Sequence, residues 1–257
     1  MDLQLTGKRA LVTGASSGLG AEIAAVLAAE GVAVVVHGRD QARTERIAQK
    51  VGGRAAIGDL TTDAGAEAVA TQTGDVDILV NNAGSYDPET GWAGADADAW
   101  ADMYNINVLS SVRLIRHLVP AMRAKGWGRV IQVGSVNGER PSAAQPHYAA
   151  SNAARLNLAR SLARDLKHTG VTSNAIAAGG ILVPATREYL LGLGRANGWG
   201  ETWEEIERNA TPVRAGTDVG RIGYPREYAD LVAYLASPVS GYITGATIRI
   251  DGGSYDA

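Results

Sequence analysis

Residues 9–20 read Arg-Ala-Leu-Val-Thr-Gly-Ala-Ser-Ser-Gly-Leu-Gly, a short apolar run followed by a turn with three glycines. The run at 9–13 predicts a buried strand, and the pattern after the turn predicts a helix to about residue 30. Glycine allows a sharp turn, and the free N–H groups at a helix start attract phosphate. The turn is either a phosphate-binding loop or simply a tight strand–helix connection, and its place at the first such junction favours phosphate binding.

The alternation of short apolar runs with longer helical patterns continues through the chain. Strands are also predicted at 32–36, 54–57, 76–80, 128–133, 171–176 and 247–250, and helices at 40–51, 63–71, 98–125 (broken near Pro120) and 147–168. Strands that alternate with helices form βαβ units and a parallel sheet. Residues 1–257 are therefore predicted to form a single doubly wound, Rossmann-like α/β domain with about seven parallel strands and helices on both faces.

Composition narrows the classes of function. Apolar residues make up 46% of the 257 positions and charged residues 20%, which suits a globular core. A net charge of −3 without a basic tract argues against nucleic acid or an anionic membrane as a partner. The chain has no cysteine, so disulfides and thiolate catalysis are excluded. Because no signal pattern or long apolar run is present, a cytoplasmic protein is expected.

Residues 182–221 interrupt the alternation of predicted strands and helices. The segment is long for a connection and contains Trp199 and Trp203. It follows the end of a predicted strand, where doubly wound sheets bind ligands, so we expect a lid over a substrate pocket. The alternative is a surface insertion of two packed helices. Trp92, Trp199 and Trp203 either line an apolar pocket for a ring-containing substrate or simply pack.

A second stretch, at 134–152, carries the candidate proton chemistry. Ser135 precedes Tyr148 by 13 residues, and Tyr148 lies near the start of a predicted helix. On that helix Tyr148 and Asn152 are four residues apart and point from one face. A helix-packed tyrosine and a capping serine are the alternatives. Leu156, Leu158 and Leu162 of the same helix suit a core or a subunit interface equally.

Together these motifs make the chain resemble the classical short-chain dehydrogenase/reductase family from end to end. The glycine turn matches its nucleotide motif, and 81–84 (Asn-Asn-Ala-Gly) and 251–253 (Asp-Gly-Gly) match two further signatures. The resemblance assigns cofactor binding to Gly14, Ser16, Ser17, Gly18, Leu19, Gly20, Asp59, Leu60, Asn82, Ala83, Gly84, Gly179 and Ile181, with Asp59 and Leu60 at the adenine. It assigns catalysis to Asn107, Ser135 and Tyr148.

The resemblance implies an oxidoreductase that interconverts a small-molecule ketone and a secondary alcohol, without a metal. Tyr148 would donate the proton in reduction and accept it in oxidation. Ser135 would hydrogen-bond the substrate oxygen, and Asn107 would help hold a water or backbone group in the relay. The family's habits imply a homodimer or a homotetramer.

The end of the second strand favours NADP(H) over NAD(H). Family members that bind NAD carry an acid where this chain has Gly38, and Arg39 follows at once. A carboxylate would repel a 2′-phosphate, whereas a guanidinium suits one in charge and geometry. Asp40 is interpreted as a helix N-cap. The alternative for Arg39 is a solvated charge at a helix start.

Asn152 departs from the family, which has a lysine four residues after the tyrosine. That lysine binds the nicotinamide ribose, and its charge favours the tyrosinate. Bringing a tyrosine pKa from about 10 to about 7 needs roughly 4 kcal/mol, which a unit charge about 4 Å away supplies at an effective dielectric of about 20. Asparagine keeps the hydrogen bonding and loses the charge. Arg155 lies on the same face two turns on and could approach, although packing on the helix surface is the expected fate.

A second departure lies at 174–183. The family usually has a proline at Ala178 and a threonine near Val183, and losing both loosens the loop that positions the nicotinamide. Three interpretations follow for the chain. It is a working reductase with a weakened relay, a protein that binds NADP(H) with slow or no turnover, or a fold now used for a non-redox or binding role. The retained Asn107, Ser135 and Tyr148 argue against the third.

Overall fold

A parallel sheet forms the centre of the computed structural model, which describes residues 1–87, 90–214 and 216–254. The sheet has seven strands in the order β3-β2-β1-β4-β5-β6-β7, and every neighbouring pair is parallel. The strands are β1 (Arg9–Val12), β2 (Ala33–Gly38), β3 (Arg54–Ile57), β4 (Ile78–Asn81), β5 (Gly128–Ser135), β6 (Val171–Ala178) and β7 (Thr247–Ile250). The predicted doubly wound fold is confirmed.

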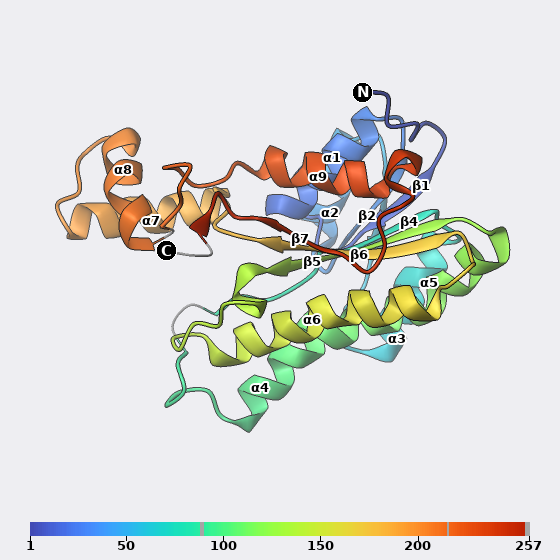
Figure 1. Cartoon of the computed structure of the whole chain (residues 1–257), viewed down its shortest axis with the longest axis horizontal. Coiled ribbons are helices and arrows are strands. Elements are labelled where there is room, and N and C mark those ends of the chain that lie inside the picture. The colour runs from blue at the N-terminus through green and yellow to red at the C-terminus, as the bar shows by residue number, and fades with distance from the viewer. Residues whose placement is uncertain (88–89, 215, 255–257) are drawn as a thin grey trace.

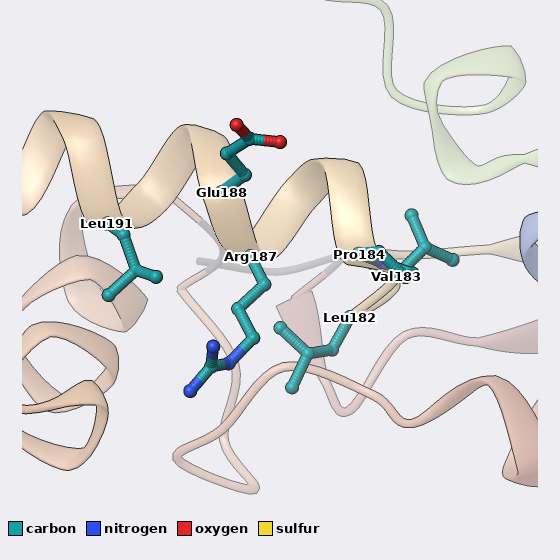
Figure 2. Close-up of a pocket in the computed structure, with 6 residues that line it drawn as sticks. All are labelled: Leu182, Val183, Pro184, Arg187, Glu188 and Leu191. Carbon is teal, nitrogen blue, oxygen red and sulfur yellow. The ribbon is translucent and has the colours of Figure 1, made fainter.

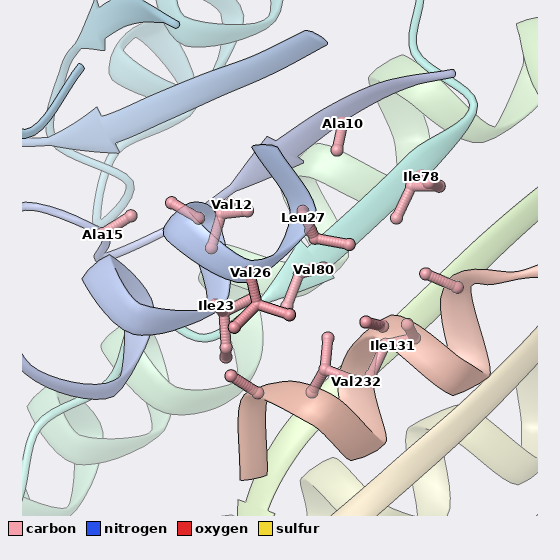
Figure 3. Packing of buried hydrophobic residues seen from close by; sticks show 14 of the residues in the cluster. Ala10, Val12, Ala15, Ile23, Val26, Leu27, Ile78, Val80, Ile131 and Val232 are labelled. Atoms are coloured by element: carbon pink, nitrogen blue, oxygen red, sulfur yellow. The ribbon is translucent and has the colours of Figure 1, made fainter. Parts of the chain in front are cut away.

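Helices cover both faces of this sheet (Figure 1). One face carries α1 (Gly18–Ala29), α2 (Gln41–Lys50) and α9 (Pro225–Ala236), and the other carries α3 (Asp63–Thr73), α5 (Ser110–Lys125) and α6 (Pro146–Asp165). Alternate strand residues pack into the two layers: Val12 and Val80 face α1 and α9, whereas Leu11 and Leu79 face α3 and α5. Figure 3 shows Ile23, Leu27 and Val232 closing the first layer over the strands.

The strand order reverses its direction of growth between β1 and β4. Both strands end at the same edge of the sheet, because they are parallel neighbours. In doubly wound folds the crevice outside the strand ends at such a reversal is where ligands bind. The glycine turn follows β1 and the Asn-Asn-Ala-Gly motif follows β4, so the fold brings these two motifs to the crevice.

The helix predicted at 98–125 differs from expectation. The structure has α4 (Ala97–Tyr104), a π-helical turn η1 (Asn105–Leu109) and then α5, which continues through Pro120. The interruption therefore lies about a dozen residues earlier than predicted. In a π turn the main-chain hydrogen bonds have a wider register than in an α-helix, and η1 contains Asn107. Such π turns often occur at functional sites.

Residues 182–221 form a lobe beside the sheet, built from α7 (Pro184–Ala196) and α8 (Trp203–Arg214) (Figure 1). Trp199 and Trp203 pack against its small apolar cluster of Leu190, Ala210 and Ile222. The two ends of the lobe meet where Leu182 N–H donates to the Gly223 carbonyl and Gly223 N–H donates to the Gly180 carbonyl. Across the described residues, no helix has the length and apolar character needed to cross a membrane.

Candidate active site and cofactor cleft

The Thr13 hydroxyl joins the ends of β1 and β4. Its oxygen accepts hydrogen bonds from the N–H groups of Asn82 and Ala83, both at 2.9 Å. In return the Asn82 Nδ2 donates to the carbonyl oxygens of Thr13 at 2.9 Å and Gly14 at 3.2 Å. These bonds fix the glycine turn against the loop after β4, so the crevice has a rigid floor.

Two glycines of the turn have no room for a side chain. A Cβ on Gly14, which has φ +62°, would lie 2.8 Å from Ala83 Cα. A Cβ on Gly20 would lie 2.5 Å from both Asn82 Nδ2 and the Gly14 carbonyl oxygen. The main chain of the turn is therefore bare at this point, which lets a phosphate group approach it.

The start of α1 supplies the chemistry for an anion. Ser17 is the N-cap residue, and within the described chain its side chain makes no capping hydrogen bond. No side chain of the cap residue therefore uses the first N–H groups of α1, which lie at the positive end of the helix dipole and can bind an anion. A bare main-chain cradle beside an uncapped helix start fits the diphosphate of a dinucleotide.

The ends of β2 and β3 border the same crevice. A Cβ on Gly38 would lie 2.3 Å from Thr44 Oγ1 and 2.9 Å from Ser16 Cβ, so an acid at position 38 would have to displace the Thr44 or Ser16 side chain. Arg39 is exposed next to it, whereas Leu60 is buried. Asp59 is exposed, and its Oδ1 accepts from the N–H and the hydroxyl of Thr61 at 3.0 and 2.8 Å. These bonds, with the charge of Arg39, lower the pKa of Asp59.

His37 is a residue of this cleft that sequence reasoning missed. Gly14 N–H donates to its Nδ1 at 3.2 Å, and its Nε2 lies 3.1 Å from the Gly58 carbonyl oxygen. The neutral ring with its proton on Nε2 satisfies both contacts. Burial lowers the pKa of His37, against the opposing effect of the Gly58 carbonyl and Asp59. A single histidine on a buried strand gives no sequence signal for this role.

The three candidate catalytic residues lie around the end of β5 and the start of α6. Ser135 ends β5, and its Oγ accepts from the Asn137 N–H at 3.2 Å. Asn107 is buried in η1, and its Nδ2 donates to the Ser151 hydroxyl at 3.0 Å. The Ser151 hydroxyl in turn donates to the Tyr148 carbonyl at 2.8 Å. Asn107 is thus linked to the main chain of Tyr148 through one side chain.

Asn107 also holds the loop that follows β4. Its Oδ1 accepts from the Ser85 N–H at 2.7 Å, and its Nδ2 donates to the Ser85 carbonyl at 3.1 Å. The next residue, Tyr86, places its ring edge-on to that of Tyr148, with centroids 5.1 Å apart. Gln145 Nε2 donates to the Tyr86 hydroxyl at 2.9 Å. Tyr86 and Gln145 were not predicted, because neither belongs to a recognisable spacing.

Asn152 is buried, and its side chain bonds to its own helix. Its Nδ2 donates to the Tyr148 carbonyl at 3.0 Å, and it is 2% exposed. The expectation that Arg155 packs on the helix surface is wrong. Arg155 is 4% exposed, and its Nη2 donates to the carbonyl oxygens of Asn81 at 3.1 Å and Ala83 at 2.6 Å. Asn152 and Arg155 are therefore both on the buried side of α6.

Tyr148 is under opposing electrostatic influences. Burial raises its pKa above the ordinary tyrosine value, and the nearby Tyr86 acts in the same direction. Hydrogen bonding to Ser135, the positive charge of Arg155 and the Asn152 side chain all lower it, but burial prevails. Tyr148 therefore keeps its proton at neutral pH and can act as an acid.

The loop after β6 reaches the same edge of the sheet. Gly179 packs so closely on β7 that a Cβ would lie 2.7 Å from Asp251 Cα. Ile181 forms an isolated parallel bridge with Gly223. Val183 approaches the glycine turn, since its Cγ1 lies 3.8 Å from the position of a Cβ on Gly18. Figure 2 shows Val183 and Pro184 at the start of α7, beside a surface pocket lined also by Leu182, Arg187, Glu188 and Leu191.

The tryptophans are divided between two places. Trp199 and Trp203 pack inside the lobe, as the packing alternative expects, and the Arg187 guanidinium lies 5.0 Å from the Trp203 ring. Trp92 is 69% exposed and contacts Trp100, with ring centroids 5.6 Å apart. Trp100 in turn neighbours the ring of His147, the residue before Tyr148, at 6.1 Å.

Comparisons with known proteins agree with this geometry. Residues 8–191 match the family model described as short chain dehydrogenase. The chain is 37% identical to an uncharacterised oxidoreductase, YvaG, of Bacillus subtilis (strain 168), over 98% of both proteins. It is 36% identical to the 3-oxoacyl-[acyl-carrier-protein] reductase FabG of Vibrio cholerae, over 98% of this chain and 99% of that protein.

Solved structures give the same result. The crystal structure of L-sorbose reductase from Gluconobacter frateurii, complexed with NADPH and L-sorbose, superposes with a TM-score of 0.90 at 31% identity, covering 100% of both chains. A putative gluconate dehydrogenase from Agrobacterium tumefaciens superposes with a TM-score of 0.87 at 28% identity, covering 100% of this chain and 99% of that one. The protein is therefore an oxidoreductase that belongs to the short-chain dehydrogenase/reductase family.

Proposed function

We propose that this protein is an NADP(H)-dependent reductase that interconverts a small-molecule ketone and a secondary alcohol, with Tyr148 as its proton donor. The observation that carries the proposal is the meeting of Ser135, Tyr148 and Asn107 at the strand ends that border the β1–β4 crevice. Ligands of doubly wound sheets bind at this place. The proposal therefore assigns the proton-transfer site and the cofactor cleft to one continuous edge of the fold.

Several residues would hold the cofactor. The turn from Gly14 to Gly20 and the start of α1 would receive the diphosphate, and Asp59 and Leu60 would border the adenine. Arg39 would bind the 2′-phosphate of NADP(H), a role supported by its exposure and by the close packing around Gly38, which disfavours an acid there. The bound nicotinamide supplies the hydride for ketone reduction, and accepts it in the reverse direction.

The side chains of the protein handle the substrate oxygen and its proton. Ser135 would hydrogen-bond the carbonyl oxygen and hold it near the Tyr148 hydroxyl. Tyr148, protonated at neutral pH because burial raises its pKa, would then donate its proton to that oxygen. Asn107 and Ser151 fix the backbone around Tyr148, so that its ring has a defined position.

Reduction is the direction that this site favours near neutral pH. A protonated Tyr148 is a ready acid for reduction, whereas oxidation needs its deprotonated form. The proposed relay has Asn152 in place of a lysine. The Asn152 side chain carries no charge, and its amide donates to the Tyr148 carbonyl. We therefore expect slow alcohol oxidation at neutral pH. A protein that binds NADP(H) but does not turn over is the alternative outcome.

The experiment combines binding with turnover. NADPH binding is followed by the change in its fluorescence, and NADPH consumption is then measured with a panel of small ketones, including keto sugars and a 3-oxoacyl thioester. We expect binding and turnover in the wild type, and intact NADPH binding with at least a hundredfold lower turnover in Tyr148→Phe. Tyr242→Phe, at a fully exposed tyrosine, is the matched control. Turnover unchanged in Tyr148→Phe would disprove the proton-donor role.

A further inference from the structure

Arg155 carries a positive charge inside the protein. Its Nη2 is held by two carbonyl oxygens at the end of β4, and it is 4% exposed. In the part of the chain that the structure describes, no carboxylate forms an ion pair with it, and its Nε has no hydrogen-bond partner. A buried charge without a counter-charge is strongly unfavourable. We therefore expect that an anion forms near the Arg155 guanidinium.

Arg155 lies two turns after Tyr148 on the same helix, α6. Residues seven positions apart on a helix lie on one face, and helical side chains lean toward the N-terminal end. Arg155 therefore leans over the turn of Asn152, in the direction of Tyr148. A Cβ on Gly84 would lie 3.2 Å from Arg155 Nη1 and 3.0 Å from Asn107 Oδ1, so the guanidinium and the Asn107 side chain both lie beside Gly84 in the loop after β4.

The two residues also interact electrostatically. The charge of Arg155 lowers the pKa of Tyr148, against the burial that raises it. Burial lowers the pKa of Arg155 to about 10, and Tyr148 acts in the opposite direction. Arg155 is therefore charged at neutral pH. The effect is mutual, as expected for a cation and a group that becomes an anion.

We propose that Arg155 is the cation of the proton-transfer site, a positioning residue that stabilises the tyrosinate form of Tyr148 and ties the loop after β4 to the catalytic helix. This deepens the proposed function and rests on it. When an alcohol is oxidised, its hydroxyl proton passes to the tyrosinate oxygen, and the hydride leaves to the nicotinamide. Before it accepts that proton, the tyrosinate is the counter-charge that the buried guanidinium otherwise lacks, while Asn152 stays neutral.

Other ionisable side chains lie on the elements around α6. Tyr86 faces Tyr148 from the loop after β4 and raises its pKa. His147 lies 3.9 Å from an Asp87 oxygen, and Glu139, in the segment between β5 and α6, lies 3.9 Å from Arg249. On α4, Asp98 and Asp102 are exposed, and Tyr104 is partly buried. Neither η1 nor β6 contains an ionisable side chain, and Arg129 of β5 bonds to the Ser237 carbonyl at the far end of its strand.

The test measures the ionisation of Tyr148 directly, without turnover. Tyrosinate absorbance is titrated with alkali in the full-length protein, and the curve of the matching Tyr148→Phe variant is subtracted. We expect the Tyr148 pKa to rise by about one unit or more in Arg155→Gln, the lower end of the effect of a close opposite charge. Arg155→Lys should retain most of the lowering. Arg160→Gln, at an exposed arginine of the same helix, is the control and should cause no shift.

A second comparison guards against misfolding. If circular dichroism shows that Arg155→Gln is unfolded, the same titration is made with Asn152→Lys and with Asn152→Lys/Arg155→Gln. Removing the guanidinium should raise the Tyr148 pKa in this background too. The proposal would be overturned if Tyr148 titrates at the same pH in the variants with and without Arg155. It would also be overturned if Tyr148 does not titrate in either variant. Failure of ketone turnover alone would overturn the proposed function and leave this result standing.

Discussion

At the scale of single residues, Tyr148 determines the pH dependence of the proposed chemistry. Its pKa is raised, chiefly by burial and also by Tyr86, although Ser135, Arg155 and Asn152 act to lower it. The protonated form therefore dominates below the raised pKa and is lost as pH rises through it. Ketone reduction uses the protonated form, and alcohol oxidation uses the deprotonated form. The two directions should consequently respond to pH in opposite ways.

We expect ketone reduction with NADPH to proceed at a constant rate across the neutral range. It should fall only when pH passes about 10, the ordinary pKa of tyrosine, because the pKa of Tyr148 is raised above that value. Alcohol oxidation should be slow at neutral pH and should increase into the alkaline range. Rates of the hydride step in both directions, measured by stopped flow over pH, test this. An oxidation rate that peaks at neutral pH would contradict it.

A lysine at position 152 should change this profile. Asn152→Lys would add an ammonium group one helical turn from Tyr148, and an opposite charge this close lowers a pKa by roughly 1–3 units. The alkaline rise of oxidation should move to lower pH, with faster oxidation at neutral pH. Asn157→Lys, at an exposed position of α6, is the control. If the Asn152→Lys profile matches the wild type, Tyr148 does not depend on this position.

His37 should make stability depend on pH in a narrow window. Its folded-state pKa is lowered by burial, below the 6.5 of an unfolded histidine, so the unfolded chain binds a proton more readily. The stability it contributes is complete above the unfolded pKa and is lost as pH falls through the folded pKa, by up to about 1.4 kcal/mol per pH unit. The carboxyl groups with lowered pKa values act below this window.

Urea unfolding between neutral pH and about pH 5 measures this loss, in the range where a histidine titrates. His37→Gln can keep both hydrogen bonds without ionising, so its unfolding free energy should be nearly level over the same range. His117→Gln, at an exposed histidine, should keep the wild-type slope. An equal slope in His37→Gln and the wild type would show that another group causes the loss.

At the scale of elements, the lobe of α7 and α8 is set apart from the sheet. It has its own apolar cluster, and a narrow base joins it to the sheet through Leu182 and Gly223. Val183, the residue before α7, approaches the glycine turn at Gly18. Tyr228 of α9 donates its hydroxyl to the Gly180 carbonyl at 2.9 Å and steadies the base. We propose that this lobe is the predicted lid, which settles over the cleft when NADPH binds.

Limited proteolysis tests the lid. Trypsin should cut after Arg195 and Arg208, which are exposed on α7 and α8. Saturating NADPH should slow these cuts several-fold, since contact with the cofactor at Val183 would disfavour local unfolding of the lobe. Cleavage after Lys167, beyond the far end of α6, is the internal control. Equal cutting of the lobe with and without NADPH would show that α7 and α8 are a rigid surface insertion.

The elements also show how far sequence reasoning extends. The strands were predicted well because Val34–Val36 of β2 and Ile78–Val80 of β4 are continuous apolar runs, as expected for strands covered on both faces. The π turn at Asn105–Leu109 was not, because it contains no proline or glycine to mark it. The burial of Arg155 was missed because the sheet-facing side of α6 contains His147, Ser151 and Asn152, so no apolar stripe marks that face. The family motifs predicted the place of the site, whereas only the structure placed the buried charge of Arg155 beside it.

At the scale of the whole molecule, the cofactor cleft is built from the ends of several strands. The glycine turn follows β1, Arg39 follows β2, Asp59 follows β3, and the Asn82 loop follows β4. These segments are far apart in sequence and meet only when the parallel sheet is complete. A ligand bound across them would therefore bind the folded state alone, and its binding energy would stabilise the entire fold.

Thermal unfolding with cofactor gives the corresponding prediction. At a concentration about 100 times its Kd, NADPH should add about 2.7 kcal/mol of stability. For a domain of this size, that raises Tm by roughly 5–10 °C. Arg39→Ala should weaken NADPH binding about tenfold, or about 1.4 kcal/mol, and so remove about half of the shift at the same concentration. NADH should give a smaller shift that Arg39→Ala does not change, because it has no 2′-phosphate. Arg43→Ala, whose exposed side chain pairs with Asp40 at 3.1 Å, is the matched control. If NADH binds at least tenfold more tightly than NADPH, the preference for NADP(H) is wrong, and Arg39 is only a solvated charge at the start of α2.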